Sequence, residues 1–557
     1  MTTADITASP IEAEPDATPP APQPAAAQAA PTAENERFAS LDILRGFALF
    51  GIFLMNIESF NRPLRSLFSD PLGTSVGIDR VASWLIYVFV VARFWTLFSL
   101  LFGAGFALLL SRAETRGHGF LATYLRRTIV LGLIGLAHGV LIWSGDILVT
   151  YSLAALLLVL ALFGNRWQRI VVLLAIAGAT ALHGNLGGYF IPLVLSLLTT
   201  AYLRTERTFR LLGRSVPLAS AIVAGMGVFA VGAGVVGLFM NKGEPAMAIC
   251  SGVALWIMAA LLTRFAEPRS QRPLVLGLSW YCTPFVAMVV AFSIMLMVGR
   301  PALDPKEAET QQKEFVEGQE KGAKRTAVEI RVLTSESYVE VVKFRSGQFM
   351  RTLANDGPSL GTFLSMFLIG LWFVRSGTLL QPEAHKSTLK RFFWIGLAIG
   401  LPLSIGATIW LPMATSHTMD DDGYALESMI HLLSGLPLTL AYASGLLLAL
   451  CTAFGKRALS WLAPVGRMAL TNYLMQSVVS ATFFYHYGLG HYGWTRIPQV
   501  GFVVVVFALQ VALSHWWLRH FRFGPMEWVW RSLTYLKPQP WRARSGAATA
   551  TAFGQPG

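Results

Sequence analysis

Windows of about twenty residues with almost no charge recur along the chain from residue 42 to residue 518. About twenty apolar residues suffice for a helix to cross the hydrocarbon core of a bilayer. Leucine, alanine, valine and glycine fill these windows without alternating with polar residues. The windows therefore predict helices and not the strands of a membrane barrel, and the chain is expected to be an all-α polytopic membrane protein.

The windows predict a bundle of about 12 to 14 transmembrane helices with one long extracytoplasmic loop. They lie at roughly 42–60, 84–111, 127–143, 147–163, 170–183, 188–203, 216–240, 246–263, 274–298, 358–376, 391–412, 429–451, 464–484 and 499–518. The predicted organisation is a disordered acidic cytoplasmic tail, an N-terminal transmembrane region, the loop, a C-terminal transmembrane region and a basic cytoplasmic tail. Their bounds are 1–38, 39–298, 299–356, 357–521 and 522–557.

Basic residues predict how this bundle is oriented. With the N-terminus inside, the short inner segments and the C-terminal tail hold 26 Lys and Arg, and the short outer loops hold five. The positive-inside rule then places both termini in the cytoplasm. The net charge of +13 reflects this orientation and not a nucleic-acid partner. Three cysteines (Cys250, Cys282 and Cys451) in apolar segments, without metal-ligand spacing, suggest neither a disulfide framework nor a zinc site.

The loop at residues 299–356 is long enough to be translocated regardless of its charge. It carries ten Lys and Arg and ten Asp and Glu in a mixed pattern, which is typical of a solvated helix.

The stretch "GLAHGVLIWSGDIL" places His138 inside an apolar run and Asp146 just after the turn "WSGD". The returning helix can bring the carboxylate beside the imidazole, where it would fix the ring tautomer as a general base requires. Two simpler interpretations stay open. Asp146 can be a helix N-cap, and His138 can hydrogen-bond a neighbouring helix.

Two helices carry an arginine at the inner end and a polar residue eleven positions further on. Arg45 precedes Asn56 by eleven residues, and Arg127 precedes His138 by eleven, which is about 16 Å along a helix. Asn56 and His138 are therefore expected at similar depth in one cavity. The alternatives are an interfacial anchor for Arg45, paired with Asp42, and a packing role for Asn56.

Two further polar patterns qualify as substrate-binding groups. Glu427 and His431 are spaced i, i+4 on the outer side, after Asp420, Asp421 and Asp422, and predict an acid/base pair or half a metal site. The alternative is a solvated acidic loop at a helix start, and too few ligands are present to assign a metal.

In "GRMALTNYLMQS", Asn472 and Gln476 share one helix face, as cavity lining or as interhelical hydrogen-bonding groups. Tyr485 and His486 follow near the outer end of this segment.

These motifs together resemble the YeiB-like family of bacterial inner-membrane proteins. "LDILRG" with Asn56, "TLFSLLFGAGF", "HGVLIWSGDIL", "GRMALTNYLMQ", "FFYH" and "WLRHFRFGPMEWVWRSLT" match its signature in order, from about residue 40 to residue 535. The chain departs from the family between roughly residues 170 and 298, where it has several more spans than expected. The resemblance implies a bacterial inner-membrane location.

The first helix, with Arg45 and Gly46, also looks like that of a wider set of transmembrane acyltransferases. This set includes the heparan-glucosaminide acetyltransferases and the sugar and glucan acyltransferases. The distant similarity implies an acyltransferase-like core within residues 39–298. Its through-going cavity would take acyl-CoA from the cytoplasm and present the acyl group to an acceptor on the other side. Some relatives carry a histidine near the first helix, where this chain has "MNIESFN", so His138 would have to take that role.

The expected function is acyl transfer to an extracytoplasmic hydroxyl or amine, such as one of a glycan or an envelope metabolite. In this hypothesis His138 is the base, Asp146 orients it and Asn56 holds the thioester oxygen, while Arg45, Arg126 and Arg127 meet the anionic acyl-CoA. Acyl-CoA is then a substrate, and no tightly bound cofactor is expected. Two alternatives are a transporter with a pathway lined by His, Asp and Asn, and a receptor or assembly protein without turnover.

Overall fold

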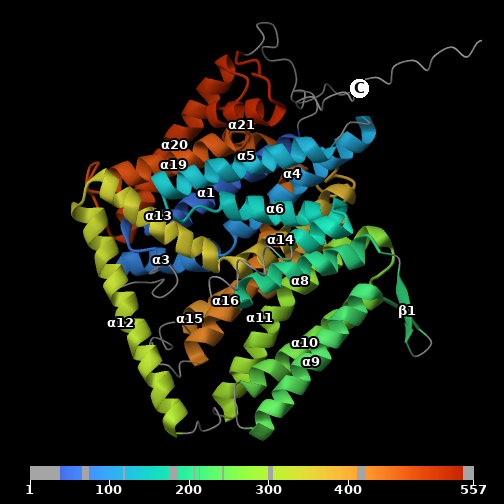
Figure 1. The fold of residues 1–557 in the computed structure, drawn as a ribbon. Coiled ribbons are helices and arrows are strands. Elements are labelled where there is room, and N and C mark those ends of the chain that lie inside the picture. Colours follow the sequence, from blue (N-terminus) through green and yellow to red (C-terminus); the bar gives the residue numbers. More distant parts are fainter. Residues whose placement is uncertain are drawn as a thin grey trace, which may run out of the picture.

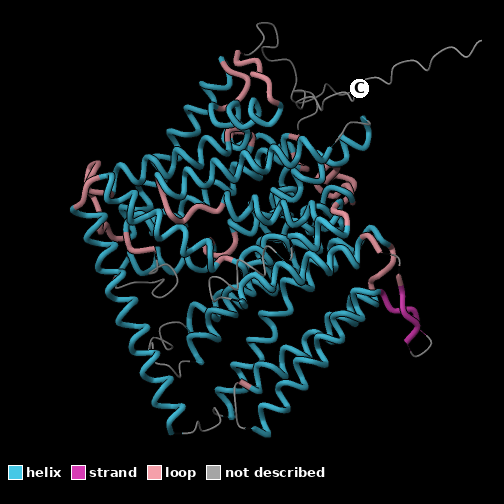
Figure 2. The backbone as a smooth tube through the Cα atoms, viewed as in Figure 1, coloured by secondary structure: helices cyan, strands magenta, loops and turns pink. Residues whose placement is uncertain are grey.

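The computed structural model describes residues 38–64, 75–116, 120–172, 174, 186–205, 207–211, 214–240, 244–298, 305–410 and 422–542. Most of them are helical, as Figure 2 shows. The helices labelled in Figure 1 and their companions are α1 (Ala39–Asn61), α3 (Gly77–Phe89), α4 (Phe94–Arg116), α5 (Phe120–Leu141), α6 (Leu148–Phe163), α8 (Leu186–Leu203), α9 (Leu218–Met240), α10 (Pro245–Arg264), α11 (Arg272–Val298), α12 (Pro305–Ser335), α13 (Tyr338–Asn355), α14 (Gly357–Arg375), α15 (Lys386–Trp410), α16 (Asp422–Leu450), α17 (Ala453–Leu459), α18 (Leu462–Arg467), α19 (Ala469–Phe484), α20 (Arg496–His520) and α21 (Pro525–Tyr535). The strands β1 (Thr208–Leu211) and β2 (Arg214–Pro217) form an antiparallel hairpin.

The all-α membrane fold is confirmed. Ten helices of the described chain are long and apolar enough to cross a membrane, and two shorter apolar helices, Leu148–Phe163 and Ile191–Leu203, accompany them. The remaining predicted spans are accounted for as follows. The predicted span 464–484 is divided between α18 and α19, because the helix is interrupted at Met468. Most of the predicted span 170–183 lies outside the described residues, and so do residues 1–37 of the predicted N-terminal tail.

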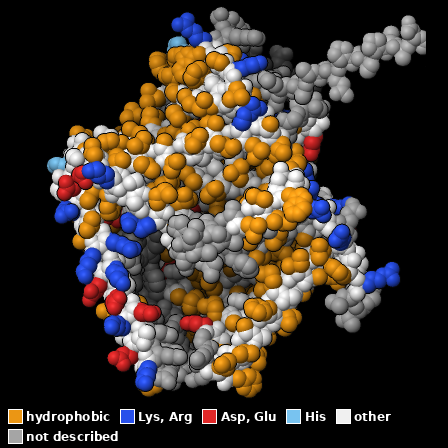
Figure 3. Space-filling view, in the orientation of Figure 1, with side chains coloured by type: hydrophobic (Ala, Val, Ile, Leu, Met, Phe, Trp, Pro, Cys, Tyr) orange, Lys and Arg blue, Asp and Glu red, His pale blue; other side chains and the backbone are white. Residues whose placement is uncertain are grey.

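The outer surface of the bundle is apolar, as lipid contact requires. On α9, Phe229 and Phe239 are 80% and 87% exposed. Hydrophobic side chains cover much of the face seen in Figure 3, including the helices at its lower right. An apolar surface of this extent marks a membrane-facing region.

The predicted span 84–111 is broken in the structure between α3 and α4. Ala92 has a positive φ of 66°, which ends the helical path at this point. The carbonyls freed by the break are bonded by side chains of other helices: the Ser404 hydroxyl of α15 donates to Val88 O at 2.9 Å, and the Tyr442 hydroxyl of α16 donates to Phe89 O at 2.9 Å. Non-helical backbone at membrane depth is tolerated when it is satisfied in this way.

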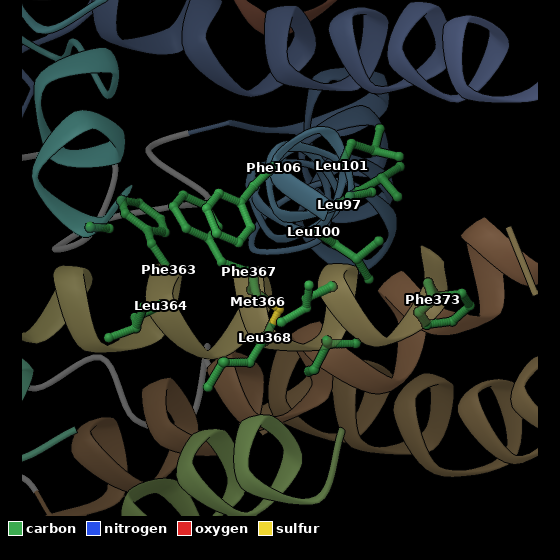
Figure 4. Packing of buried hydrophobic residues seen from close by; sticks show 14 of the residues in the cluster. Leu97, Leu100, Leu101, Phe106, Phe363, Leu364, Met366, Phe367, Leu368 and Phe373 are labelled. Carbon is green, nitrogen blue, oxygen red and sulfur yellow. The ribbon is translucent and has the colours of Figure 1, made fainter. Parts of the chain in front are cut away.

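Glycines bring the central helices into backbone contact. A Cβ at Gly103 of α4 would lie 2.4 Å from Phe367 O of α14, and a Cβ at Gly370 of α14 would lie 2.0 Å from Leu100 O of α4. Small residues at helix interfaces permit this close approach in membranes. Around the contact, Phe106 of α4 lies near Phe367 of α14, as Figure 4 shows. The buried side chains of helices α4 and α14 belong to the main hydrophobic core.

The long loop predicted at residues 299–356 forms two helices, α12 and α13, in the described part that begins at Pro305. Helix α12 runs along the left edge of the molecule in Figure 1, and Figure 3 shows its Lys, Arg, Asp and Glu side chains on the surface, as the mixed charge pattern predicts. Helix α13 packs on the end of α5. The Tyr338 hydroxyl and the Arg345 guanidinium both donate to Leu141 O, at 3.0 and 3.1 Å, so they satisfy a carbonyl in the last turn of α5.

Candidate active site

His138 and Asp146 form a buried hydrogen-bonded pair between α5 and the turn that leads into α6. The Nδ1–H group of His138 donates to Oδ1 of Asp146 at 2.8 Å, and the two side chains are 1% and 0% exposed. Because a carboxylate only accepts hydrogen bonds, this contact assigns the proton of the neutral ring to Nδ1 and leaves Nε2 as an acceptor. Nε2 is buried and has no hydrogen-bond partner among the described residues.

The second oxygen of Asp146 caps α6. Oδ2 accepts from the backbone N–H groups of Leu148 at 2.8 Å and Val149 at 3.2 Å. Gly135 of α5 makes room for it, since a Cβ there would lie 2.8 Å from Oδ2. The sequence offered Asp146 two compatible roles, a helix cap and a partner for His138, and the carboxylate makes both contacts, one with each oxygen.

Aromatic rings surround the dyad and connect it to α1. The ring centroid of Tyr473 of α19 lies 5.3 Å from that of His138, and Trp143 lies 6.3 Å from it in an edge-on arrangement. Trp143 in turn stacks on Phe60, near the end of α1, at 4.9 Å. Asn56, one turn before Phe60, is buried, but no hydrogen bond joins it to the dyad among the described residues. Its role toward a thioester oxygen stays a prediction.

A basic pocket of about 140 Å³ opens where α1 begins and α21 lies. We call this the basic pocket. Six arginines line the pocket, and Asp42 and Glu527 are its two acidic residues; the arginines are Arg45, Arg112, Arg127, Arg467, Arg522 and Arg531. Arg45 donates to Asp42 Oδ1 at 3.3 Å, which is the ion pair that the sequence offered as the alternative role of Arg45. The positive groups outnumber the negative ones, so the pocket suits an anion.

Glycines place these arginines side by side. A Cβ at Gly46 of α1 would lie 2.3 Å from Leu462 O, so α1 and α18 approach each other backbone to backbone. This contact brings Arg45 of α1 next to the end of α18, where Arg467 lies. Gly105 of α4 leaves space for the guanidinium of Arg45, whose Nη2 is 3.5 Å from a Cβ built on that glycine.

Helix α21 forms one wall of the pocket and is tied to two neighbouring helices. Glu527 Oε1 accepts from the backbone N–H of Leu470 at 2.6 Å and of Thr471 at 3.1 Å, so it caps the start of α19. Burial raises the pKa of Glu527, and these hydrogen bonds act against that rise. Trp530 lies under the guanidinium of Arg127, 3.7 Å from the ring centroid, and its Nε1–H donates to Arg127 O at 2.8 Å.

The two adjacent arginines of α5 differ in position. Arg127 lines the pocket, whereas Arg126, which the sequence also assigned to acyl-CoA, is not one of the lining residues. The Nε–H group of Arg126 donates to Ala122 O of its own helix at 3.3 Å. Consecutive residues point about 100° apart around a helix, so the two side chains cannot share one face.

Glu427 and His431 are both buried in the structure but bond different partners. The Tyr87 hydroxyl donates to Glu427 Oε1 at 3.0 Å, and the Tyr87 ring stacks on His431 with centroids 3.9 Å apart. The Arg93 guanidinium lies against His431 Nε2, with Nη1 at 2.7 Å. An arginine only donates, so Nε2 accepts from it and is not available to a metal.

Arg93 was not selected from the sequence. It is fully buried at the break between α3 and α4, and its other guanidinium contacts are Ser404, Ser434 at 2.7 Å and Val91 O. One charged residue inside the otherwise uncharged stretch 84–111 was the signal that could have identified it.

Asn472 and Gln476 of α19 take part in interhelical hydrogen bonds. Asn472 Nδ2 donates to Ser514 Oγ of α20 at 3.1 Å, and Gln476 Nε2 donates to Gln510 Oε1 of α20 at 3.0 Å. These bonds fix the rotation of α19 about its axis. They are the contacts expected of the packing alternative, and a role in lining a cavity stays a prediction.

A family model described as "Protein of unknown function (DUF418)" matches residues 373–537. The chain is 28% identical over 525 residues to the uncharacterized protein YxaH of Bacillus subtilis (strain 168), and the match covers 92% of this chain and 97% of YxaH. It is 26% identical over 507 residues to the uncharacterized protein YeiB of Escherichia coli (strain K12), with 90% and 96% covered. These matches support a YeiB-like family for the chain.

The YeiB-like similarity extends well beyond the C-terminal segment that the family model matches. A third relative, an uncharacterized 39.9 kDa protein in the amylase 3′ region of Bacillus acidopullulyticus, is 41% identical over 128 residues, which is 23% of this chain and 35% of that protein. No solved structure gives a significant match.

Proposed function

We propose that this YeiB-like protein is a membrane acyltransferase that moves an acyl group from acyl-CoA to a hydroxyl or amine acceptor. One observation supports the proposal above the others: Arg127 of the basic pocket and His138 of the dyad lie on the same helix. Arg127 of α5 lines the pocket, and His138 follows it by eleven residues, about 16 Å along the axis. An extended pantetheine arm is of this order of length, so phosphates in the pocket would leave the thioester near His138.

The charge of the pocket fits the phosphates of CoA. Guanidinium groups bind phosphate through paired charge-assisted hydrogen bonds. Both carboxylates of the pocket already have partners, because Asp42 accepts from Arg45 and Glu527 caps α19. The Nε atom of Arg467 is buried and has no hydrogen-bond partner in the described chain, so it is a donor that a ligand can satisfy.

The dyad supplies the general base. With its proton on Nδ1, His138 accepts the acceptor's proton at Nε2 as the acceptor oxygen or nitrogen attacks the thioester carbon. Asp146 then balances the positive imidazolium. When the carbon–sulfur bond breaks, the imidazolium returns the proton to the CoA thiolate, and acceptor, acyl group and proton are all accounted for.

The orientation of the bundle gives this transfer a direction. The excess of basic residues in the predicted inner segments supports a cytoplasmic position for the pocket, on the side where acyl-CoA is found. The acceptor would then approach from the opposite side of the membrane, as a glycan or an envelope metabolite. The bacterial inner membrane is the proposed location.

A transporter is the second candidate, and the broken helix α3–α4 favours it. Discontinuous helices with buried charged groups near mid-membrane are typical of transporter binding sites. Arg93 is such a group, with neutral partners only among the contacts described above. A transporter would move a solute into proteoliposomes without consuming acyl-CoA.

The proposed function is tested by acetyl-CoA binding and turnover with purified protein. We expect radiolabelled acetyl-CoA to bind the wild type, and Arg467→Gln to weaken binding by about 10- to 100-fold, since a hydrogen bond to a charged group contributes about 1.5–3 kcal/mol. Arg126→Gln is the matched control, because Arg126 lies beside the pocket without lining it. Labelled acetate or an acetylated acceptor should appear with the wild type and not with His138→Ala. Absence of binding by the wild type contradicts the proposal.

A further inference from the structure

Tyr473 is a buried residue next to the dyad whose hydroxyl makes no well-formed hydrogen bond with the described residues. It lies in α19 with 4% of its surface exposed. Its ring centroid is 5.3 Å from that of His138, and the ring planes are inclined at 54°. The Asp146 carboxylate and the backbone of Ile147 are near enough to interact with this hydroxyl, but neither completes a hydrogen bond of good geometry with it.

Two polar atoms of these neighbouring residues are therefore buried without a well-formed hydrogen bond among the described residues: Oη of Tyr473 and Nε2 of His138. Buried polar groups in native proteins are nearly always hydrogen-bonded, so an unpartnered pair requires an explanation. The two atoms are chemically complementary. Nε2 accepts, because Nδ1 carries the ring proton, and the phenol hydroxyl donates. A molecule that satisfies both offers one donor and one acceptor oxygen.

We propose that Tyr473 is a catalytic residue whose hydroxyl donates a hydrogen bond to the thioester carbonyl oxygen of the acyl donor. This inference rests on the proposed acyl transfer. The attacking acceptor offers the donor group to Nε2 of His138, and the carbonyl offers the oxygen to Tyr473. Nε2 and Oη are then both hydrogen-bonded, one to the attacking group and the other to the carbonyl oxygen of the same reacting carbon.

Each step of the transfer balances with this assignment. The acceptor's lone pair forms a bond to the carbonyl carbon, its proton moves to Nε2, and the carbonyl π electrons move to the oxygen. Tyr473 stabilises that oxyanion by hydrogen bonding and keeps its own proton. The carbonyl then re-forms, the carbon–sulfur bond breaks, and the CoA thiolate takes the proton from Nε2.

The fold fixes Tyr473 relative to His138 through its neighbours on α19. Glu527 caps the start of this helix from the wall of the basic pocket. One residue before Tyr473, Asn472 donates to Ser514 Oγ and to Val465 O, both at 3.1 Å. The helix therefore cannot rotate freely, and the phenol stays on the side of the imidazole, as oxyanion stabilisation by a preorganised donor requires.

The test compares two non-reactive CoA analogues that differ at the carbonyl. One is the ketone in which a methylene group replaces the thioester sulfur of acetyl-CoA, and the other is S-ethyl-CoA, which lacks the carbonyl. We expect the wild type to bind the ketone about 10-fold more tightly, as one hydrogen bond of about 1–1.5 kcal/mol implies. Tyr473→Phe should bind both analogues equally, with S-ethyl-CoA affinity unchanged.

Protein stability separates this role from a structural one. Since Oη makes no well-formed hydrogen bond, Tyr473→Phe should unfold close to the wild-type temperature. The matched control is Tyr281→Phe, which removes a hydroxyl that donates to Leu432 O at 2.7 Å. This control should lose stability and keep the preference for the ketone.

Two results overturn the assignment in different ways. If Tyr473→Phe keeps the wild-type preference for the ketone, Tyr473 does not contact the carbonyl, and the acyl-CoA site itself still stands. If the wild type binds neither analogue, the proposed function fails and the role of Tyr473 fails with it.

Discussion

The backbone of Gly466 in α18 touches the carbonyl oxygen of Asp42 in α1. A Cβ at Gly466 would lie 1.8 Å from Asp42 O and 2.9 Å from Gly46 N, so no side chain fits between the two helices. The contact holds Arg45 and Arg467 at the same pocket, because each arginine is adjacent in sequence to one of the two glycines. The geometry of the basic pocket therefore depends on the absence of a side chain at Gly466.

Gly466→Ala should therefore separate α1 from α18, lower stability and weaken acetyl-CoA binding. Overpacking of a tight interface costs about 1–3 kcal/mol, and backbone cannot move aside as a flexible side chain can. Thermal unfolding and acetyl-CoA titration of the purified variant measure both effects. Gly501→Ala on α20 is the control, because a Cβ there meets no atom within 4 Å. Equal behaviour of the two variants would contradict the packing argument.

The dyad makes a separate prediction about turnover. His138→Ala should lower the rate of acyl transfer by about 10²–10⁴-fold, as loss of a general base does, while it removes only one intramembrane hydrogen bond of about 0.6–2 kcal/mol. Turnover of radiolabelled acetyl-CoA at equal membrane abundance checks this. Near-wild-type turnover would make the dyad structural and would direct attention to Glu427 and His431.

Substitutions of Asp146 separate its two contacts. Asp146→Asn keeps an oxygen that can cap α6, but it cannot balance an imidazolium charge, so we expect near-normal stability and impaired turnover. Asp146→Ala loses both contacts and should also unfold at a lower temperature. If Asp146→Asn turns over as fast as the wild type, the carboxylate serves α6 alone.

The sequence predicted those parts of the site that arise from local structure. His138 and Asp146 are eight residues apart across one short turn, so the helix pair that follows from hydropathy already brings them together. Arg45 and Arg127 were found because they begin predicted spans. Arg126 shows the limit of this reasoning, since the face of a helix that a residue occupies depends on the neighbours that pack against it.

Long-range packing explains what the sequence could not predict. Arg467 reaches the pocket through the α1–α18 contact, and Tyr473 looks like an ordinary core aromatic until His138 is placed beside it. The side-chain partners of Arg93 come from more than 300 residues further along the chain. Hydropathy identifies each of these helices, but it does not show which helix faces meet. The helix break at Ala92 could not be predicted either, because no proline or glycine stands beside it in the sequence.

Arg93 is expected to stabilise the helix break, and Arg93→Lys should be destabilising. An ammonium group has three donors and cannot reproduce a guanidinium that bonds His431, Ser434 and two further groups. The loss of two or more hydrogen bonds within the membrane corresponds to about 1–4 kcal/mol. Thermal unfolding should show this loss for Arg93→Lys and not for Arg80→Lys on the exposed surface of α3. Equal unfolding temperatures would contradict this role for Arg93.

Glu329 of α12 predicts a dependence of stability on pH. Its side chain is buried and accepts from Leu64 N at 3.1 Å, and burial raises its pKa above the usual glutamate value. Because the folded pKa is the higher one, folding favours the protonated form. Its contribution to the free energy of unfolding is largest below the usual pKa of about 4.3 and declines as pH rises through the folded pKa.

Hydrogen exchange of α12 and α13 measures this dependence. Protection should decrease between pH 4.5 and pH 8 in the wild type, after correction for the intrinsic effect of pH on exchange. In Glu329→Gln the side chain stays neutral, and the decrease should be smaller. The same decrease in both proteins would assign the pH dependence to another group.

The orientation of the bundle is the last prediction, and the proposed direction of acyl transfer depends on it. The predicted inner segments and tail carry 26 basic residues against five in the short outer loops, so residues 299–356 should lie outside the cytoplasm and Arg207 inside it. Both Lys313 on α12 and Arg207 beside β1 are exposed in the structure and accessible to a reagent. Single cysteines at these positions, in a chain with Cys250, Cys282 and Cys451 replaced by serine, should react differently with an impermeant thiol reagent added to intact cells. We expect labelling at Lys313→Cys, with Arg207→Cys labelled only after the membrane is opened. The reverse pattern would place the basic pocket outside, away from cytoplasmic acyl-CoA, and would remove the source of the donor from the proposed reaction.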